Sequence, residues 1–225
     1  MSQRLLFPDA EAAADALTFA GRTARLGDGG VRLQAANGTL AITSAPLAPR
    51  GLFDTTPTVL ALRALPVDPE LVCDLVVDAT LLAAASDDAR AVVLPEVAQS
   101  PAWAGISPPR GGWESVGGIA ASVLASRAQY GIAAVAEAMP ADPGEDVVRT
   151  VRASVWGAPD DALGNLPLGA AFAAFALGFI AGEEEAQVRR AAAWTRVTLR
   201  RGHVLVRGPV RAGLTPVRET GGGPA

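Results

Sequence analysis

A dipeptide at positions 37 and 38 constrains the fold more than any other local feature of this sequence. Asn37-Gly38 lies between two runs in which apolar and polar residues alternate, VRLQAA before it and TLAITSA after it. Alternation with a period of two is typical of strands, and Asn-Gly is a preferred dipeptide of the type I′ turn that joins two antiparallel strands. Residues 31–45 are therefore predicted to form a β-hairpin.

The rest of the first hundred residues is predicted to complete a sheet with one flanking helix. Helix formers follow Pro8, and Asp9 stands where its side chain can cap the N-terminus of a helix of several turns. Short apolar runs at 58–66 and 89–97 are typical of strands. The run at 71–85 is compatible with either a strand or a helix, and the sequence does not decide between them.

The hydrophobic period changes in the second half of the chain. Apolar residues recur at steps of three and four over 119–139, which predicts a helix, and Asp142 and Glu145 suit the capping box of a second one. A third helix is expected over 168–181, a run without a polar side chain. Because a transmembrane helix needs about 20 predominantly apolar residues, this shorter run is predicted to be a core helix.

The C-terminal part of the chain is predicted to contain a basic hairpin. Apolar and polar residues alternate on both sides of Arg200-Arg201-Gly202, from Trp194 to Gly208. No internal repeat is visible in the sequence. The predicted fold class is α+β, with an N-terminal antiparallel β-sheet half joined to a helical half that a C-terminal β-hairpin closes.

The segment PAWAGISPPRGGW, at 101–113, lies where the hydrophobic period changes. A flexible linker is usually small and polar, whereas this segment contains two tryptophans and three prolines. We therefore expect an ordered connector with Trp103 and Trp113 packed between the two halves. The expected organisation is a mainly antiparallel β half with one helix at 1–98, the connector at 99–113, a helical half with the basic hairpin at 114–219, and a disordered tail at 220–225.

Few residues offer catalytic chemistry. All 19 basic residues are arginine, which excludes Schiff-base chemistry and a P-loop lysine. One cysteine, Cys73, excludes an internal disulfide and a cysteine-built metal site, and the N-terminus has no signal-peptide pattern, so a cytoplasmic location is expected. The single histidine, His203, is interpreted as a polar residue beside a turn. We therefore expect no catalytic residue, no cofactor and no metal site.

Four aspartates keep an enzymatic hypothesis open. Asp74 and Asp78 are four residues apart, and Asp87 and Asp88 are adjacent. Paired carboxylates can bind divalent metals or transfer protons. The alternative is a polar face followed by a charged turn, which is favoured because no glycine-containing calcium loop surrounds them. An enzyme with a dispersed carboxylate and arginine site is the third hypothesis for function.

Charge is distributed unevenly along the chain. Residues 186–225 contain eight arginines and one acidic residue, whereas residues 113–185 contain three arginines and ten acidic residues. The basic end either contacts nucleic-acid phosphates or pairs with the acidic middle of this chain or of a neighbouring subunit. Charge pairing is favoured, because the third predicted helix has no polar side chain with which to contact bases. The candidate interaction residues are Trp103, Arg110, Trp113, Arg196, Arg200, Arg201 and His203.

Three segments carry a resemblance to other proteins. PPRGGWESVGGI, LGAAFAAFALGF and AWTRVTLRRGHVLVR, all within residues 99–208, resemble segments of uncharacterised hypothetical proteins from high-GC actinobacteria. The resemblance implies no activity, cofactor or catalytic residue. The favoured hypothesis is a non-enzymatic interaction or structural protein that forms a homo-oligomer or binds a protein partner, with no membrane association. A nucleic-acid-associated protein that uses the basic C-terminal hairpin is the alternative.

Overall fold

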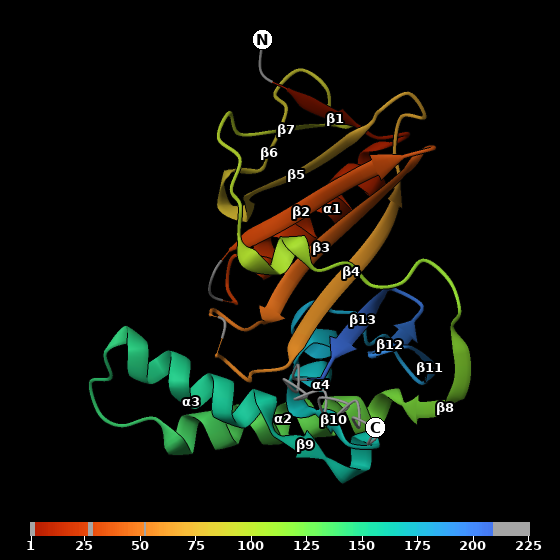
Figure 1. Cartoon of the computed structure of the whole chain (residues 1–225). Helices are drawn as coiled ribbons and strands as arrows, with labels where there is room; N and C mark the ends of the chain where they lie inside the picture. Colours follow the sequence, from red (N-terminus) through yellow and green to blue (C-terminus); the bar gives the residue numbers. More distant parts are fainter. Residues whose placement is uncertain (1–2, 27–28, 52, 209–225) are drawn as a thin grey trace, which may run out of the picture.

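One antiparallel sheet of eight strands joins the two halves of the chain (Figure 1). The computed structural model describes residues 3–26, 29–51 and 53–208. The strand order of the large sheet is β5-β2-β3-β4-β13-β12-β11-β8, so the two halves of the chain meet where β4 pairs with β13. The sheet consists of β2 (Gly30–Ala36), β3 (Thr39–Leu47), β4 (Thr58–Pro66), β5 (Cys73–Asp78), β8 (Glu114–Ala120), β11 (Glu185–Ala191), β12 (Trp194–Leu199) and β13 (Gly202–Arg207). The predicted α+β class is confirmed.

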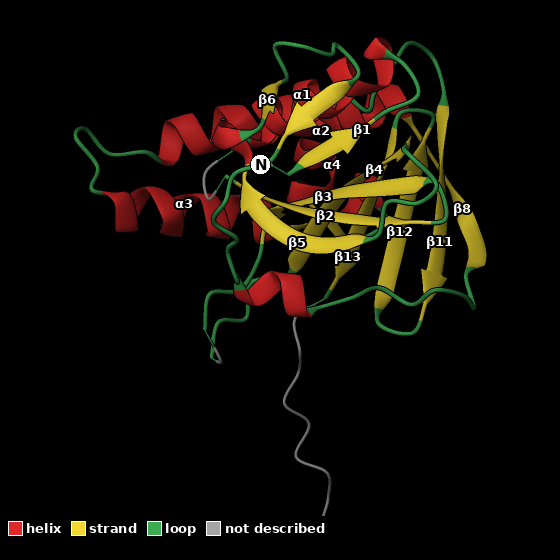
Figure 2. Ribbon diagram, turned by 90° about the horizontal axis from the view of Figure 1, so that it is seen from above, coloured by secondary structure: helices red, strands yellow, loops and turns green. Residues whose placement is uncertain are grey.

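The helices lie on one face of this sheet (Figure 2). They are α1 (Ala10–Thr23), α2 (Ala121–Ala138), α3 (Glu145–Gly157) and α4 (Leu168–Ala176). The larger hydrophobic core lies between this layer and the sheet, and it includes Phe19, Leu33 and Phe179. Two small sheets flank the helices, one made of β1 (Arg4–Leu6), β6 (Ala83–Ala84) and β7 (Ala91–Val93), the other of β9 (Pro159–Asp160) and β10 (Leu166–Pro167).

The large sheet contains a structural repeat that the sequence does not show. In each half a helix is followed by three successive antiparallel strands: α1-β2-β3-β4 and α4-β11-β12-β13. Each helix follows a short strand, β1 or β10, and each set of three strands ends at the central β4–β13 pair. The rings of Phe19 and Phe179 stack between the two units, with centroids 6.2 Å apart.

The elements with strong local signals form as predicted. Asn37 and Gly38 have φ angles of 51° and 75°, and Ala36 pairs with Thr39, so the predicted two-residue turn is confirmed. A carboxylate oxygen of Asp9 accepts a hydrogen bond of 2.8 Å from the backbone N–H of Ala12, which confirms the cap of α1. The strand at 58–66, the helix beginning near 119 and the C-terminal hairpin also form.

Helix α4 is shorter than the predicted helix over 168–181. It ends at Ala176, because Gly178 adopts a left-handed φ of 72° and turns the chain toward the sheet. Phe179 therefore lies beyond the end of the helix that contains Phe172 and Phe175. Phe179 is fully buried, whereas Phe175 is 40% exposed. Within the described residues, no helix has both the length and the apolar character that crossing a membrane would require.

Other boundaries also differ from the expectations. Helix α3 begins at Glu145 with Gly144 at its N-cap position, and Asp142 has a φ of 54° and does not cap it. The ambiguous run at 71–85 forms strand β5, a 3-10 turn and the two-residue strand β6. Strands β8 and β11 were not predicted from the sequence. The predicted tail at 220–225 lies outside the described residues.

Candidate interaction surface

A second apolar cluster lies on the outer face of the sheet, which we define as the face opposite the helices. Its buried members come from both halves and are Leu60, Val76, Trp103, Trp194 and Leu205. Trp103 belongs to a 3-10 turn over Ala102–Gly105, and Trp113 packs against the same cluster. The connector is therefore ordered on the sheet between the halves, and the expected packing of both tryptophans is confirmed. We call residues 99–113 the strap.

Polar contacts hold the strap on the sheet. The Arg32 guanidinium on β2 donates to the carbonyl oxygen of Ala104 at 2.7 Å and makes two hydrogen bonds, of 2.8 and 2.9 Å, to the Asp74 carboxylate. The backbone N–H of Gln99 donates to the carbonyl oxygen of Val76 at 2.7 Å. The Arg32 guanidinium lowers the pKa of Asp74, so this carboxylate stays ionised and keeps its hydrogen bonds to Arg32. We call the contacts of Arg32 with Asp74 and Ala104 the strap anchor.

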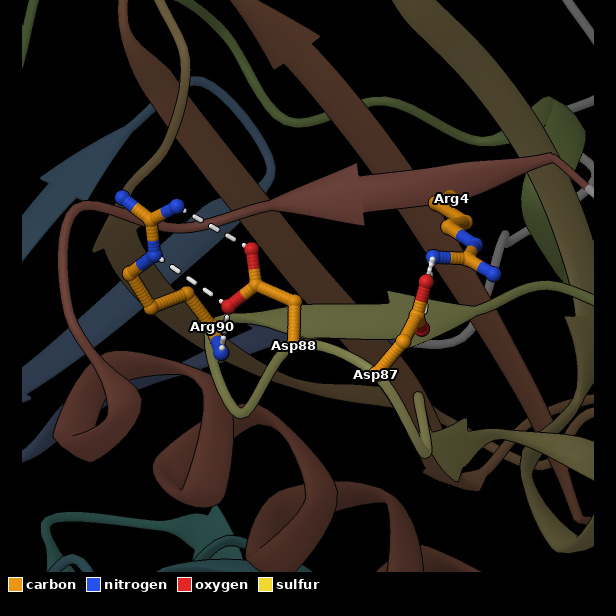
Figure 3. Close-up of polar contacts among 4 residues, drawn as sticks. All are labelled: Arg4, Asp87, Asp88 and Arg90. Atoms are coloured by element: carbon orange, nitrogen blue, oxygen red, sulfur yellow. Dashed lines mark hydrogen bonds and ion pairs between the residues drawn. The ribbon is translucent and has the colours of Figure 1, made fainter.

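The other three candidate aspartates also make local structural contacts, and Figure 3 shows those of Asp87 and Asp88. Asp87 pairs with Arg4 of β1 at 2.8 Å, and Asp88 pairs with Arg90 at 3.0 Å. Asp78 accepts hydrogen bonds from the backbone and hydroxyl of Thr80. In the described part of the chain, no group of three His, Cys, Asp or Glu residues is arranged to hold a metal ion.

Arg196 lies at the centre of a basic region on the outer face. Its guanidinium carbon is 4.5 Å from the ring centroid of Trp113, whose Nε1 donates to the carbonyl oxygen of Pro109 at 3.1 Å. Arg196 is directly opposite Arg189 in the β11–β12 pair. Burial, and then the charge of Arg189, lower the pKa of Arg196.

His203 lies on the same face, where burial and then the charge of Arg196 lower its pKa. Its Nδ1 is 3.1 Å from the hydroxyl oxygen of Thr198. His203 is therefore half-buried in the sheet, not a solvated residue of the turn. Arg110 is exposed and lines a cavity of ≈ 190 Å³ between the strap and the sheet. The same cavity is also lined by Arg32, Gln34, Thr43, Leu60, Leu62, Trp103, Ile106, Ser107, Pro108 and Leu205.

The structure separates Arg200 and Arg201 from the other candidates. They form the turn of the C-terminal hairpin, where the backbone N–H of Arg200 donates to the Glu184 carboxylate at 3.0 Å and the carbonyl oxygen of Arg201 accepts from Arg63. The structure thus brings together Trp103, Arg110, Trp113, Arg196 and His203 on the outer face, but not the two turn arginines. Arg189 was not among the predicted residues, although its spacing of two from Gln187 would place both on one face of a strand.

Within the described residues, the basic end does not form ion pairs with the acidic middle of this chain; pairing with a neighbouring subunit stays a prediction. None of the described arginines from 189 to 207 forms an ion pair with a described carboxylate. Arginines elsewhere are neutralised, including Arg127 by Asp160 and Arg63 by Asp15. Unpaired positive charge therefore gathers on β11–β13.

Strand β8 forms one edge of the large sheet (Figure 1). It pairs with β11 on one side, and no other strand of the described chain pairs with it. Six of its seven residues are exposed, and Val116 is 49% exposed. A cavity of ≈ 470 Å³ lies near β10 and the β11–β12 turn, lined by Pro57, Pro167, Arg190 and Trp194 among others.

Two domain families match the chain in succession. Residues 1–105 match the family described as Domain of unknown function (DUF8010), and residues 108–211 match Domain of unknown function (DUF8185). The search of curated proteins found no match. The two matched regions meet inside the strap, whereas the sheet continues across both of them.

Solved structures identify the architecture. One similar structure is a DnaN sliding clamp (DNA polymerase III subunit beta) from Bartonella birtlesii bound to griselimycin, with a TM-score of 0.51 and 12% identity. The protein has a sliding-clamp-like fold. A putative DNA polymerase III beta subunit from Eubacterium rectale has a TM-score of 0.50 and 7% identity. Each comparison covers 94% of this chain and 66% of the matched chain, so this sliding-clamp-like chain spans about two thirds of their length.

Proposed function

We propose that this protein is a non-enzymatic interaction protein that self-associates through edge strand β8. The observation that carries the proposal is the open edge of β8, which presents backbone N–H and C=O groups with no partner strand in the described chain. Such an edge is a template for pairing with another chain. The sliding-clamp-like fold supports a role as a scaffold, since the solved structures that share it are described as subunits of DNA polymerase III.

The composition of β8 favours a second copy of the same strand as its partner. Its sequence, ESVGGIA, has one charged residue, Glu114, and no proline or lysine of the kind that blocks edge pairing. In an antiparallel pair of two copies, Glu114 near one end of β8 would lie at the opposite end from Glu114 of the second copy, so like charges would not meet. Such a contact is isologous and closes as a dimer with two-fold symmetry.

The contacts of the polar residues support a non-enzymatic role. The four candidate aspartates are engaged in the strap anchor, in ion pairs or in a local cap. Burial raises the pKa of the Cys73 thiol, which disfavours the nucleophilic thiolate. We also propose a cytoplasmic location, for which the lone, half-buried Cys73 is the support, and an origin in a high-GC actinobacterium, for which the all-arginine basic set is the support.

Multi-angle light scattering after size exclusion tests self-association. We expect the native protein to have the mass of a dimer, and Val116→Arg to have the mass of a monomer, because a charged side chain in the middle of an edge strand disfavours pairing with another strand. Val72→Arg is the matched control, since Val72 is 79% exposed and outside the strands. A native protein that stays monomeric at all concentrations, or a Val116→Arg variant that remains dimeric, would overturn the edge proposal.

Nucleic-acid association is the second candidate function. The observation that favours it is the group of arginines on β11–β13 without carboxylate partners in the described chain.

A further inference from the structure

We propose that the outer face of β11, β12 and β13 is a binding surface for the phosphate backbone of double-stranded nucleic acid, with Arg189, Arg196 and Arg207 as its phosphate contacts. The proposal rests on the second candidate function and specifies its site. It is independent of the pairing of β8, because the contacts lie on the face of the sheet and not on its edge.

Strand register places the three arginines together. Arg189 and Arg196 are direct partners across β11 and β12, and direct partners share a face of the sheet. Arg196 is opposite Leu205 of β13, and Arg207 lies two residues further along that strand on the same face. Arg207 is thus a diagonal neighbour of Arg196, a relation that brings long side chains within reach of each other.

This arrangement has a cost that an anion would offset. Like charges directly opposite each other in an antiparallel pair are destabilising, and no carboxylate of the described chain neutralises Arg189 or Arg196. The Nε of Arg196 is buried without a hydrogen-bond partner in the described chain. Arginine stays protonated even when it is partly buried beside another arginine, so the surface keeps its positive charge. A phosphate between the guanidinium groups would convert their repulsion into two charge-assisted contacts.

Neighbouring groups add to the same surface. Gln187 and Thr198 are direct partners on this face; Gln187 Oε1 accepts a hydrogen bond of 3.3 Å from Arg189, which leaves the amide nitrogen of Gln187 as an uncharged donor. Arg110 lines the strap cavity together with Leu205, the residue opposite Arg196. Arg110 is exposed and therefore supplies a further cation at the rim. The ring of Trp113 fixes the position of Arg196 by the contact at 4.5 Å.

The availability of aromatic rings favours duplex over single-stranded nucleic acid. Binding of single strands relies on exposed aromatic faces on which bases stack. Here Trp103 and Trp194 are 8% and 6% exposed, and Arg196 covers a face of Trp113. The surface thus offers guanidinium groups that can contact a phosphate backbone. None of its described tryptophans has an open ring face on which a base could stack.

The helical layer does not offer a comparable surface. The exposed positions of α1 and α2 carry no arginine. Arg22 donates to the carbonyl oxygen of Leu177, and Arg127 pairs with Asp160. Among the described residues, α1 and α2 therefore have no counterpart to the cluster of Arg189, Arg196 and Arg207.

Fluorescence anisotropy with a labelled duplex DNA of mixed sequence, about 20 base pairs long, tests the surface. We expect the native protein to bind with a dissociation constant that rises steeply with salt, as displacement of counterions requires. The double variant Arg189→Gln/Arg196→Gln should reduce the slope of log K against log salt by about two, and Arg207→Gln, which leaves the Trp113 contact intact, by about one.

Matched controls separate a specific surface from net charge. Arg4→Gln/Arg149→Gln removes the same charge from two arginines that form exposed ion pairs, and it should leave the salt slope nearly unchanged. Circular dichroism confirms that each variant is folded. Equal losses in both double variants, tighter binding of the single strand than of the duplex, or no binding by the native protein would each overturn the proposal. Duplex binding by the Val116→Arg variant is expected to persist, so failure of self-association and failure of this surface are distinguishable.

Discussion

Two glycines on helices α1 and α2 show how one neighbouring side chain reverses the effect of the same substitution. Gly21 is exposed on α1, and a Cβ added there would meet no atom within 4 Å. Gly131 is buried on α2, and a Cβ there would overlap the six-membered ring of Trp156. That ring cannot move freely, because it is 3% exposed and stacks on Phe172 with centroids 4.2 Å apart.

We expect Gly21→Ala to stabilise the protein by about 0.5–1 kcal/mol, since alanine loses less backbone entropy in a helix. Gly131→Ala should instead destabilise it by about 1–3 kcal/mol, since the gain in helix propensity is smaller than the cost of displacing a packed ring. Free energies of unfolding from urea titrations measure both effects. Stabilisation by Gly131→Ala would show that α2 and α3 are less closely packed than the structure indicates.

At the level of secondary-structure elements, the end of α4 determines which phenylalanine belongs to the core. Gly178, with its left-handed φ of 72°, ends the helix and directs Phe179 toward the sheet. The Phe179 ring packs against the backbone of Gly202 on β13, where a Cβ would overlap it. Phe175 remains on the helix and is 40% exposed. The predicted core helix over 168–181 therefore does not bury Phe175 fully.

The same substitution at both positions tests this assignment. Phe179→Ala should cost about 3–5 kcal/mol, since it removes a fully buried ring and its stacking on Phe19. Phe175→Ala should cost about 1 kcal/mol or less, since much of that ring is already in contact with water. Thermal or urea unfolding of the two variants gives the comparison. Equal losses would mean that the helix continues through Gly178, as the sequence alone suggested.

Elements whose signals are local were predictable, and those that depend on distant partners were not. The Asn37-Gly38 turn and the Asp9 cap depend on neighbouring residues, so the sequence predicts them correctly. Strands β8 and β11 were missed, because their glycine and arginine residues are more typical of loops than of strands. Both strands are stabilised by pairing with each other, and β11 also pairs with β12. The alternation of Gln187 and Arg189 was the one usable signal for β11.

The same limit applies to the candidate surface. Trp113 and Arg196 were both candidate residues, but their contact joins positions 83 residues apart and depends on the fold of the strap over the sheet. Arg189 had no local signal of function, because its partner is another arginine across a strand pair. Residue types and charge excess can be read from the sequence, whereas the face on which they meet follows from strand register.

At the scale of the whole molecule, the two family matches and the single sheet lead to opposite expectations for folding. Matches that divide near residues 105–108 suggest two independent units, as does the predicted division around the strap. The β4–β13 pair, however, runs through the centre of the sheet. Val59, Leu60 and Ala61 of β4 are all at most 2% exposed and face both layers. Separating the halves would therefore expose a long apolar strand on an open edge.

We therefore expect the full chain to unfold in one cooperative transition, with coincident urea curves from far-ultraviolet circular dichroism and from tryptophan fluorescence. A fragment of residues 1–106 alone should show no cooperative transition, since it lacks Phe179 as well as β13. The fragment 107–225 should behave likewise, because Trp194 and Leu205 would lose Trp103 and Leu60 from the outer cluster. Mixing the fragments should restore the circular dichroism signal of the intact protein. A folded, cooperatively melting N-terminal fragment would instead establish two autonomous domains, and the shared sheet would then be an interface between them and not the core of one folding unit.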